Sequence, residues 1–194
     1  MRRSTALPRW IVIVLALSAG AVLAVFAVLM ATEKRVAAAA PDFRVVTTGG
    51  IEYEAMQGRQ IDPDNAVDRP IVEGLSAADR RRRRGTILFG AFFSVTNDSA
   101  HALRTAQQIE LRDALSGDVY RPVSLPASNA YAYRARVVRP GNRLPGVGSP
   151  ADANLAATGL MLLFRIPAFD YDDGVLELVI HDPLQPAHTV SLTI

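Results

Sequence analysis

The chain has 194 residues, no cysteine and a formal net charge of +2. The lack of cysteine excludes disulfides, iron–sulfur clusters, cysteine nucleophiles and cysteine-bound zinc. From Asp42 onward there are 16 arginines against 18 acidic residues, so the small positive excess does not indicate a nucleic-acid binder.

An apolar segment at residues 10–31 is the first element of the chain. A helix of this length covers about 33 Å, close to the ~30 Å hydrocarbon core of a bilayer. We therefore predict a transmembrane signal-anchor at 10–31, a cytoplasmic tail at 1–9, a tether at 32–42 and an extracytoplasmic domain at 43–194. The small residues Ala37–Ala40 leave cleavage of a signal peptide as the alternative.

The flanks of this segment encode its orientation only weakly. Three arginines precede it and three basic residues follow it, so the short N-terminal tail is what favours a cytoplasmic N-terminus. Within the segment, Ala16, Gly20 and Ala24 recur at every fourth position. This spacing lets two helices approach closely and makes the three residues a candidate helix–helix contact, although an alanine-rich sequence also produces it by chance.

Short segments of β-type pattern fill the domain. Residues 43–55 predict a first strand that is broken or bulged at Gly49-Gly50, and residues 86–96 predict the strongest strand, buried at the centre of a sheet. Further strands are predicted at 108–113, 119–121, 129–138, 160–166, 175–180 and 189–194. Seven to eight short strands with regular turns and no long helical period predict an all-β, antiparallel β-sandwich after the transmembrane helix.

An irregular charged insert is predicted at residues 57–84. It contains turn-forming residues at Asp62–Asn65 and several acidic side chains, and it ends in five consecutive arginines. Ser76–Asp79 can open one helical turn, but the adjacent arginines repel each other and favour an exposed segment.

Three pieces of the domain carry a family resemblance. They are the strand and turn at 92–97, the Gly117–Tyr120 turn after an alternating strand, and Leu163–Pro167 ahead of the Leu176–Leu178 strand. Together they resemble the telokin-like, immunoglobulin-like domains of exported actinobacterial proteins. The resemblance implies an immunoglobulin-like sandwich and an extracytoplasmic location, and it supplies no catalytic motif.

The arginine run is the strongest candidate binding feature. Arg80, Arg81, Arg82, Arg83 and Arg84 are suited to phospholipid headgroups, a phosphate-bearing wall polymer or an acidic partner. The alternative is a solvated loop that offsets the acidic stretch before it.

A second candidate surface lies in the predicted strand at 129–138. Tyr131 and Tyr133 share one face and neighbour Arg134 and Arg136, a combination that is frequent at protein–protein contacts. The alternative places the tyrosines in the core and the arginines on the opposite face.

Other constellations fit catalysis or metal binding poorly. The acidic group at Asp170–Asp173 lacks the glutamate that an EF-hand needs at position twelve, where His181 stands, so an acidic turn is predicted. His181 and Asp182 could form a base and its orienting carboxylate, but no nucleophile is identifiable. Three dispersed histidines make no zinc signature, and Asn97–Ser99 is explained as a turn without glycosylation.

These patterns predict a non-enzymatic, single-pass membrane protein. Its extracytoplasmic domain is expected to act as an adaptor or accessory subunit of a cell-envelope complex, with a protein partner and without cofactor, metal or nucleic acid. The alternative is a binding module for an anionic lipid or wall polymer through Arg80–Arg84. A hydrolase that uses His181 and Asp182 is the third hypothesis.

Overall fold

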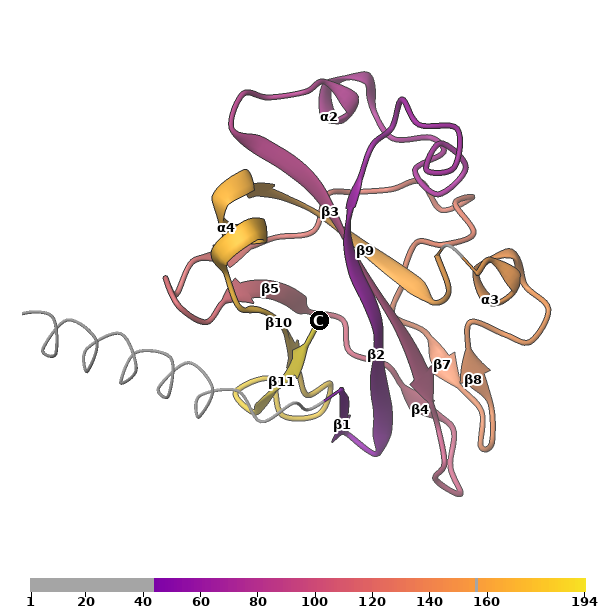
Figure 1. Cartoon of the computed structure of the whole chain (residues 1–194). Coiled ribbons are helices and arrows are strands. Elements are labelled where there is room, and N and C mark those ends of the chain that lie inside the picture. The colour runs from indigo at the N-terminus through magenta and orange to yellow at the C-terminus, as the bar shows by residue number, and fades with distance from the viewer. Residues whose placement is uncertain (1–43, 156) are drawn as a thin grey trace, which may run out of the picture. The chain divides into compact units, whose positions relative to one another are not determined.

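The computed structural model describes residues 44–155 and 157–194 (Figure 1). The predicted anchor at 10–31, with Ala16, Gly20 and Ala24, lies outside these residues. No helix in the described ranges is long and apolar enough to cross a membrane.

Strands make up most of the ordered elements. They are β1 (Val45–Thr48), β2 (Ile51–Ile61), β3 (Thr86–Thr96), β4 (Leu103–Arg104), β5 (Ile109–Asp113), β6 (Val119–Tyr120), β7 (Val137–Val138), β8 (Arg143–Leu144), β9 (Leu160–Pro167), β10 (Leu176–His181) and β11 (Thr189–Thr193). Three short helices accompany them in the described residues: α2 (Ala77–Arg80), α3 (Pro150–Ala153) and α4 (Ala168–Asp173).

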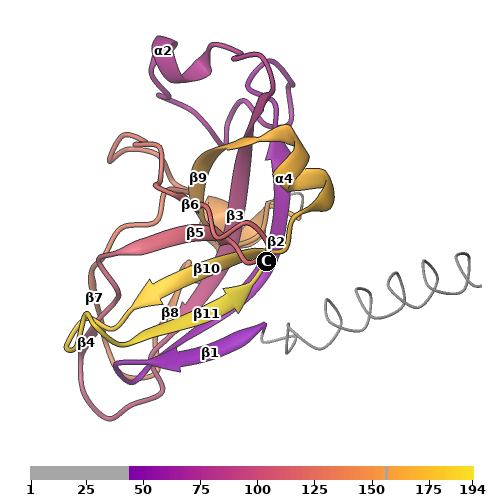
Figure 2. The ribbon, with the colours of Figure 1, turned by 90° about the vertical axis from the view of Figure 1, so that its left-hand side faces the viewer.

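The strands pair into antiparallel sheets that pack together, as the sequence predicted. Within the described residues the larger sheet has five strands, in the order β1-β2-β3-β8 with β9 also paired to β3. The smaller sheet has the order β11-β10-β5-β6, and β4 pairs with β7 alone. Figure 2 shows β5, β10 and β11 as a layer in front of β2 and β3.

Strand β3 lies at the centre of the larger sheet. It pairs with β2 along one side and with β9 along the other. Phe89 and Phe93 point to one face, Leu88 and Phe92 to the other, and all four are buried. A strand covered on both faces reads as a continuous apolar run, which is why residues 86–96 were predictable from the sequence.

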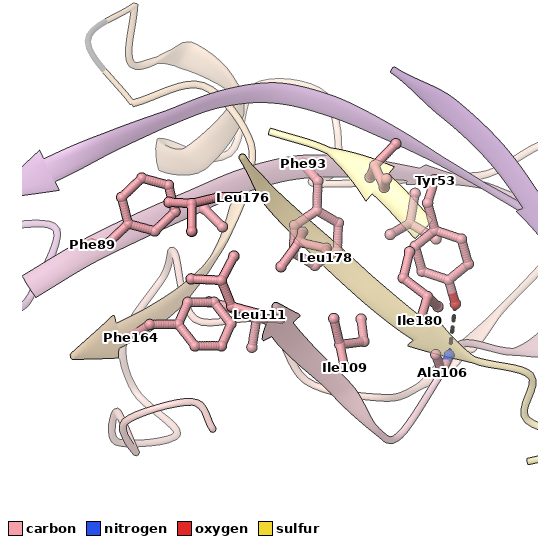
Figure 3. Packing of buried hydrophobic residues seen from close by; sticks show 14 of the residues in the cluster. Tyr53, Phe89, Phe93, Ala106, Ile109, Leu111, Phe164, Leu176, Leu178 and Ile180 are labelled. Atoms are coloured by element: carbon pink, nitrogen blue, oxygen red, sulfur yellow. Dashed lines mark hydrogen bonds between the residues drawn. The ribbon is translucent and has the colours of Figure 1, made fainter. Parts of the chain in front are cut away.

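The main hydrophobic cluster fills the space between the two sheets (Figure 3). Phe93 and Phe164 enter it from the larger sheet, and Leu111 and Leu178 enter it from the smaller one. The hydroxyl of Tyr53 accepts a hydrogen bond from the backbone N–H of Ala106 at 2.7 Å, so the polar end of this buried ring is satisfied.

A second hydrophobic cluster covers the outer face of the larger sheet. Ile71, Val72 and Leu75, from the segment after β2, pack there against Phe92 and Leu163. The structure therefore corrects the predicted insert 57–84 in two ways. Its first residues continue strand β2 as far as Ile61, and part of the remainder is a buried cover of the sheet.

Two predicted strands differ in the structure. Gly49 and Gly50, with φ of +57° and +76°, form the turn of a hairpin between β1 and β2, so they do not break or bulge one strand. Residues 129–138 form a strand only at Val137–Val138. The reason is local: the side-chain carbonyl of Asn129 accepts hydrogen bonds from the N–H groups of Tyr131 and Ala132, which folds this segment into a turn.

Candidate anion-binding cleft

The arginine run begins at the last residue of α2 and ends at Arg84, two residues before β3 begins. Ser76 caps α2 by accepting a hydrogen bond from the N–H of Asp79 at 3.0 Å. The chain leaves the helix in extended conformation at Arg81, and Gly85, with φ of +71°, turns it into β3. All five arginine side chains, Arg80–Arg84, are exposed. In Figure 1 this segment lies at the top of the domain.

Four of these arginines line a cleft of about 230 Å³ at the end of the larger sheet. Its walls carry five arginines and one aspartate: Arg80, Arg81, Arg82, Arg83, Arg165 and Asp62. Ile61 and Leu88 contribute an apolar part of the lining. Arg84, although adjacent in sequence, is not among the lining residues.

One arginine of the run is paired with acid. Arg82 Nη2 lies 2.9 Å from Asp62 Oδ2 and 3.5 Å from Asp64 Oδ2. These side chains are mostly exposed, so the pairing contributes little to stability. Within the described part of the chain, Arg80, Arg81, Arg83 and Arg84 form no ion pair.

The fifth arginine of the cleft, Arg165, belongs to β9 and is half-buried. Its guanidinium donates to the hydroxyl of Thr86 at 3.4 Å and to the backbone carbonyl of Asp79. Both acceptors are neutral, and no carboxylate of the described residues forms an ion pair with it. Arg165 is therefore a positioned charge that forms no ion pair within the described residues.

The pKa of Arg165 reflects this environment. Burial lowers the pKa of the guanidinium first, the positive charge of Arg83 lowers it further, and Asp79 partly offsets both effects. Arginine remains charged at physiological pH despite such a shift. The local field of the cleft is therefore positive at Arg165.

The second predicted surface is dispersed by the fold. Tyr131 is buried in the outer cluster at 7% exposure, whereas Tyr133 packs against the cluster between the sheets, where its hydroxyl donates to the carbonyl of Ala106 at 2.6 Å. Arg134 and Arg136 are exposed, and Arg134 donates to the carbonyl of Leu125 at 2.7 Å. The two tyrosines therefore do not share one exposed stripe.

His181 and Asp182 are adjacent in the chain but have different partners. The Nδ1 atom of His181 lies 3.1 Å from the carbonyl of Pro186, and its Nε2 lies 3.6 Å from a carboxylate oxygen of Glu110. Asp182 accepts hydrogen bonds from Thr48, Gly49, Leu184 and Gln185. Asp182 thus fixes two neighbouring turns and does not orient the imidazole of His181.

The predicted acidic turn at Asp170–Asp173 is wrong in its conformation. These residues belong to the helix α4, and Asp170 is buried at 1% exposure. Its Oδ2 accepts a short hydrogen bond from the hydroxyl of Tyr120, while its Oδ1 has no partner among the described residues. Among residues 44–155 and 157–194, no group of three or more histidine or acidic side chains is arranged to hold a metal ion.

Asn97 has the turn role that the sequence predicted. It is fully buried, and its amide donates to the carbonyls of His101 and Val138 at 2.8 Å each. Its carbonyl oxygen accepts from Ser99. The side chain is therefore committed to internal hydrogen bonds.

Sequence reasoning missed Arg165 as a site residue. The predicted strand at 160–166 contains Arg165, which is the one charged residue in β9. A charge inside such a strand is a signal in itself, because it must reach a partner, a ligand or solvent.

No protein-family model matches the sequence, and no curated protein matches it. Two solved structures of uncharacterised Bacillus proteins are similar. The yjhA protein from Bacillus subtilis is 9% identical, with a TM-score of 0.41 over 74% of this chain and 82% of that chain. A conserved hypothetical protein from Bacillus anthracis is 9% identical, with a TM-score of 0.41 over 76% of this chain and 91% of that chain. The resemblance to telokin-like domains stays a prediction.

Proposed function

We propose that the protein is a single-pass membrane adaptor whose extracytoplasmic, immunoglobulin-like β-domain binds an anionic phospholipid surface. The contact is the cleft lined by Arg80–Arg83 and Arg165. The observation that carries this proposal is the excess of positive charge in the cleft. Of its five arginines, only Arg82 forms an ion pair with a carboxylate among the described residues.

The energetics favour an anionic surface. Basic side chains within a Debye length of an anionic membrane contribute about 1 kcal/mol each. Arg80, Arg81 and Arg83 are exposed and unpaired within the described ranges, so binding need not first break an internal ion pair. Three such residues give about 3 kcal/mol before any contact by Arg165.

An exposed aromatic side chain favours lipid over a soluble polymer. Phe169 is 63% exposed in α4, two residues after Pro167, which pairs with Thr86 at the start of β3. It therefore belongs to the same end of the sheet as the arginine run. Surfaces that lie in a membrane interface typically combine basic residues with exposed apolar side chains such as phenylalanine.

The predicted tether is long enough for this contact. The carbonyl of Arg44 accepts a hydrogen bond from Ala55, and six further residues of β2, about 20 Å, lead to Ile61 at the cleft. An extended tether over residues 32–42 spans at most about 40 Å. An anchor at 10–31 would thus hold the domain within reach of the membrane that contains it.

The test uses the full chain embedded in neutral phosphatidylcholine nanodiscs on a sensor surface. Vesicles containing phosphatidylglycerol are passed over it at rising salt, with phosphatidylcholine vesicles as the blank and soluble poly(glycerol phosphate) as the second ligand. We expect capture of the phosphatidylglycerol vesicles, weakening with salt and abolished when Arg80–Arg84 are all replaced by glutamine.

Each other result contradicts the proposal. Capture of poly(glycerol phosphate) without capture of vesicles would identify the ligand as a wall-type polymer. Equal capture by the five-glutamine variant would remove the arginine run from the contact. Capture that does not weaken with salt would exclude an electrostatic mechanism.

A further inference from the structure

Arg165 is fixed in the cleft by the strands around it. Its backbone pairs with Leu88 of β3, so the neighbouring strand fixes its position in the sheet. The arginine segment is also bound to this strand. The hydroxyl of Thr86 accepts from Arg165 and donates to the carbonyl of Arg83 at 3.1 Å. Arg165 and Arg83 are therefore held beside each other through Thr86.

This arrangement leaves most of the guanidinium unused. A guanidinium has five N–H donors, and two of those of Arg165 are directed at Thr86 and at Asp79. The remaining donors belong to a side chain whose alignment is already determined. A guanidinium fixed in this way loses less conformational entropy on binding an anion than an exposed arginine does.

The size and charge of the cleft restrict the ligand. Its volume of about 230 Å³ is below the 300–1,000 Å³ of sites for drug-sized ligands, so it accommodates a small group and not a whole molecule. Five arginines face one aspartate, which Arg82 already occupies. A small anionic group with several acceptor oxygens meets this arrangement best, and a phosphoryl group has both properties.

We infer that the cleft binds a phosphate group, with Arg165 as the fixed donor and Arg83 as the donor that approaches from the rim. This inference rests on the proposed function and specifies its chemistry. It separates one shaped site, at Arg165, from the diffuse attraction that the rest of the arginine run exerts. The phosphate can belong to a lipid headgroup or to free phosphate, and the test distinguishes these sources.

The experiment measures binding of radiolabelled inorganic phosphate to the full chain in nonionic detergent by equilibrium dialysis at constant ionic strength. The variants are Arg165→Gln, Arg165→Lys and the matched control Arg139→Gln. The control removes the same charge from an exposed turn outside the cleft. Thermal unfolding of each variant verifies that the fold is retained.

We expect one phosphate per wild-type chain and unchanged affinity in Arg139→Gln. Arg165→Gln should weaken binding about tenfold or more, because a charge-assisted hydrogen bond is lost. Arg165→Lys keeps the charge but loses the planar set of guanidinium N–H donors. Its affinity for phosphate should therefore lie between those of the wild type and Arg165→Gln. In a parallel arm, phosphatidylglycerol vesicles should be captured less by Arg165→Gln than by wild type if lipid is the source. Loss of phosphate binding with unchanged vesicle capture would assign the site to free phosphate.

Wild-type affinity in a folded Arg165→Gln chain would overturn the inference. So would equal weakening in Arg139→Gln, which would show a general charge effect, or no phosphate binding by the wild type. None of these results would by itself overturn the proposed function. That proposal is tested separately, by salt-dependent capture of phosphatidylglycerol vesicles through Arg80–Arg84.

Discussion

Arg59 and Arg165 are two half-buried arginines on the same outer face of the larger sheet, on opposite sides of β3. Arg59, on β2, lies 2.7 Å from the carboxylate of Asp68 and 5.6 Å from the centre of the Phe92 ring. Arg165, on β9, donates hydrogen bonds to the neutral oxygens of Thr86 and Asp79 and forms no ion pair among the described residues. Among the described residues, Arg59 is held in an ion pair and Arg165 is not.

The difference separates a structural charge from a functional one. The carboxylate of Asp68 also accepts the N–H of Asp62, so the Arg59–Asp68 pair closes the segment that covers the outer hydrophobic cluster. Arg165 donates to the backbone carbonyl of Asp79 but forms no ion pair of this kind, and the cleft beside it is lined mainly by arginines. The comparison predicts that perturbing the first charge lowers stability, whereas perturbing the second lowers binding.

The largest expected effect is at the compensated pair. Asp68→Ala should lower the free energy of unfolding by about 3 kcal/mol, because it leaves Arg59 as an unpaired and partly buried charge. The matched control is Asp64→Ala, whose carboxylate is 72% exposed and which should change stability by less than about 0.5 kcal/mol. Urea unfolding of the full chain in detergent, followed by circular dichroism, measures both. Equal effects would refute the distinction between buried and surface pairs.

A smaller effect is expected where a buried acid has only a neutral partner. Tyr120→Phe removes the hydroxyl that donates to Asp170, and should cost about 2 kcal/mol because both carboxylate oxygens are then unpartnered among the described residues. The double variant Tyr120→Phe, Asp170→Leu should recover part of this loss, since the unsatisfied acid is gone. Unfolding midpoints of the single and double variants test this, and a double variant less stable than the single one would contradict it.

The carboxylate of Asp182 makes the stability of the domain depend on pH. Burial raises the pKa of Asp182, and the hydrogen bonds from Leu184, Gln185, Thr48 and Gly49 lower it by more, so the net pKa is below its usual value. A depressed pKa contributes stability above the unfolded pKa of about 3.9, and this contribution is lost as the pH falls through the folded pKa.

Asp182→Asn should therefore cost on the order of 1 kcal/mol near neutral pH and progressively less below about pH 4. Urea unfolding between pH 7 and pH 3 measures this difference, with the exposed Asp98→Asn as the control. A cost that grows with acidification would be opposite to the expected sign.

The smallest effect on stability is expected at the uncompensated arginine. Arg165→Gln should change the free energy of unfolding by about 1 kcal/mol or less, because no ion pair is broken and only hydrogen bonds to neutral oxygens are lost. Arg59→Gln is the paired comparison and should be clearly destabilising. If Arg165→Gln destabilised the domain as much as Arg59→Gln, Arg165 would be a structural charge.

The parts of the fold that depend on local pattern were predictable. The strand at β3 has the predicted bounds Thr86–Thr96, and β9 and β10 fall within a residue of their predicted ends, because these strands are long apolar runs between clear turns. The 129–138 segment failed because the side chain of Asn129 organises a turn that alternation alone does not reveal.

The site was predictable only in part. The run Arg80–Arg84 is visible in the sequence as a charge cluster, but Arg165 joins it through hydrogen bonds across 79 and 86 residues of chain. Contacts over such separations follow from the pairing of β3 with β9, which the sequence pattern does not specify. Sequence alone therefore identified the rim of the cleft and not its fixed donor.

The central claim is that the cleft adds a specific contact to the general attraction that the charge of the arginine run exerts. Arg83 and Arg84 are adjacent and exposed, yet only Arg83 lines the cleft. The most direct test compares Arg83→Gln with Arg84→Gln in capture of phosphatidylglycerol vesicles by the full chain in neutral nanodiscs, since both variants lose one charge. We predict that Arg83→Gln weakens capture clearly more than Arg84→Gln, which loses only its share of the general attraction. Equal losses in the two variants would contradict the account.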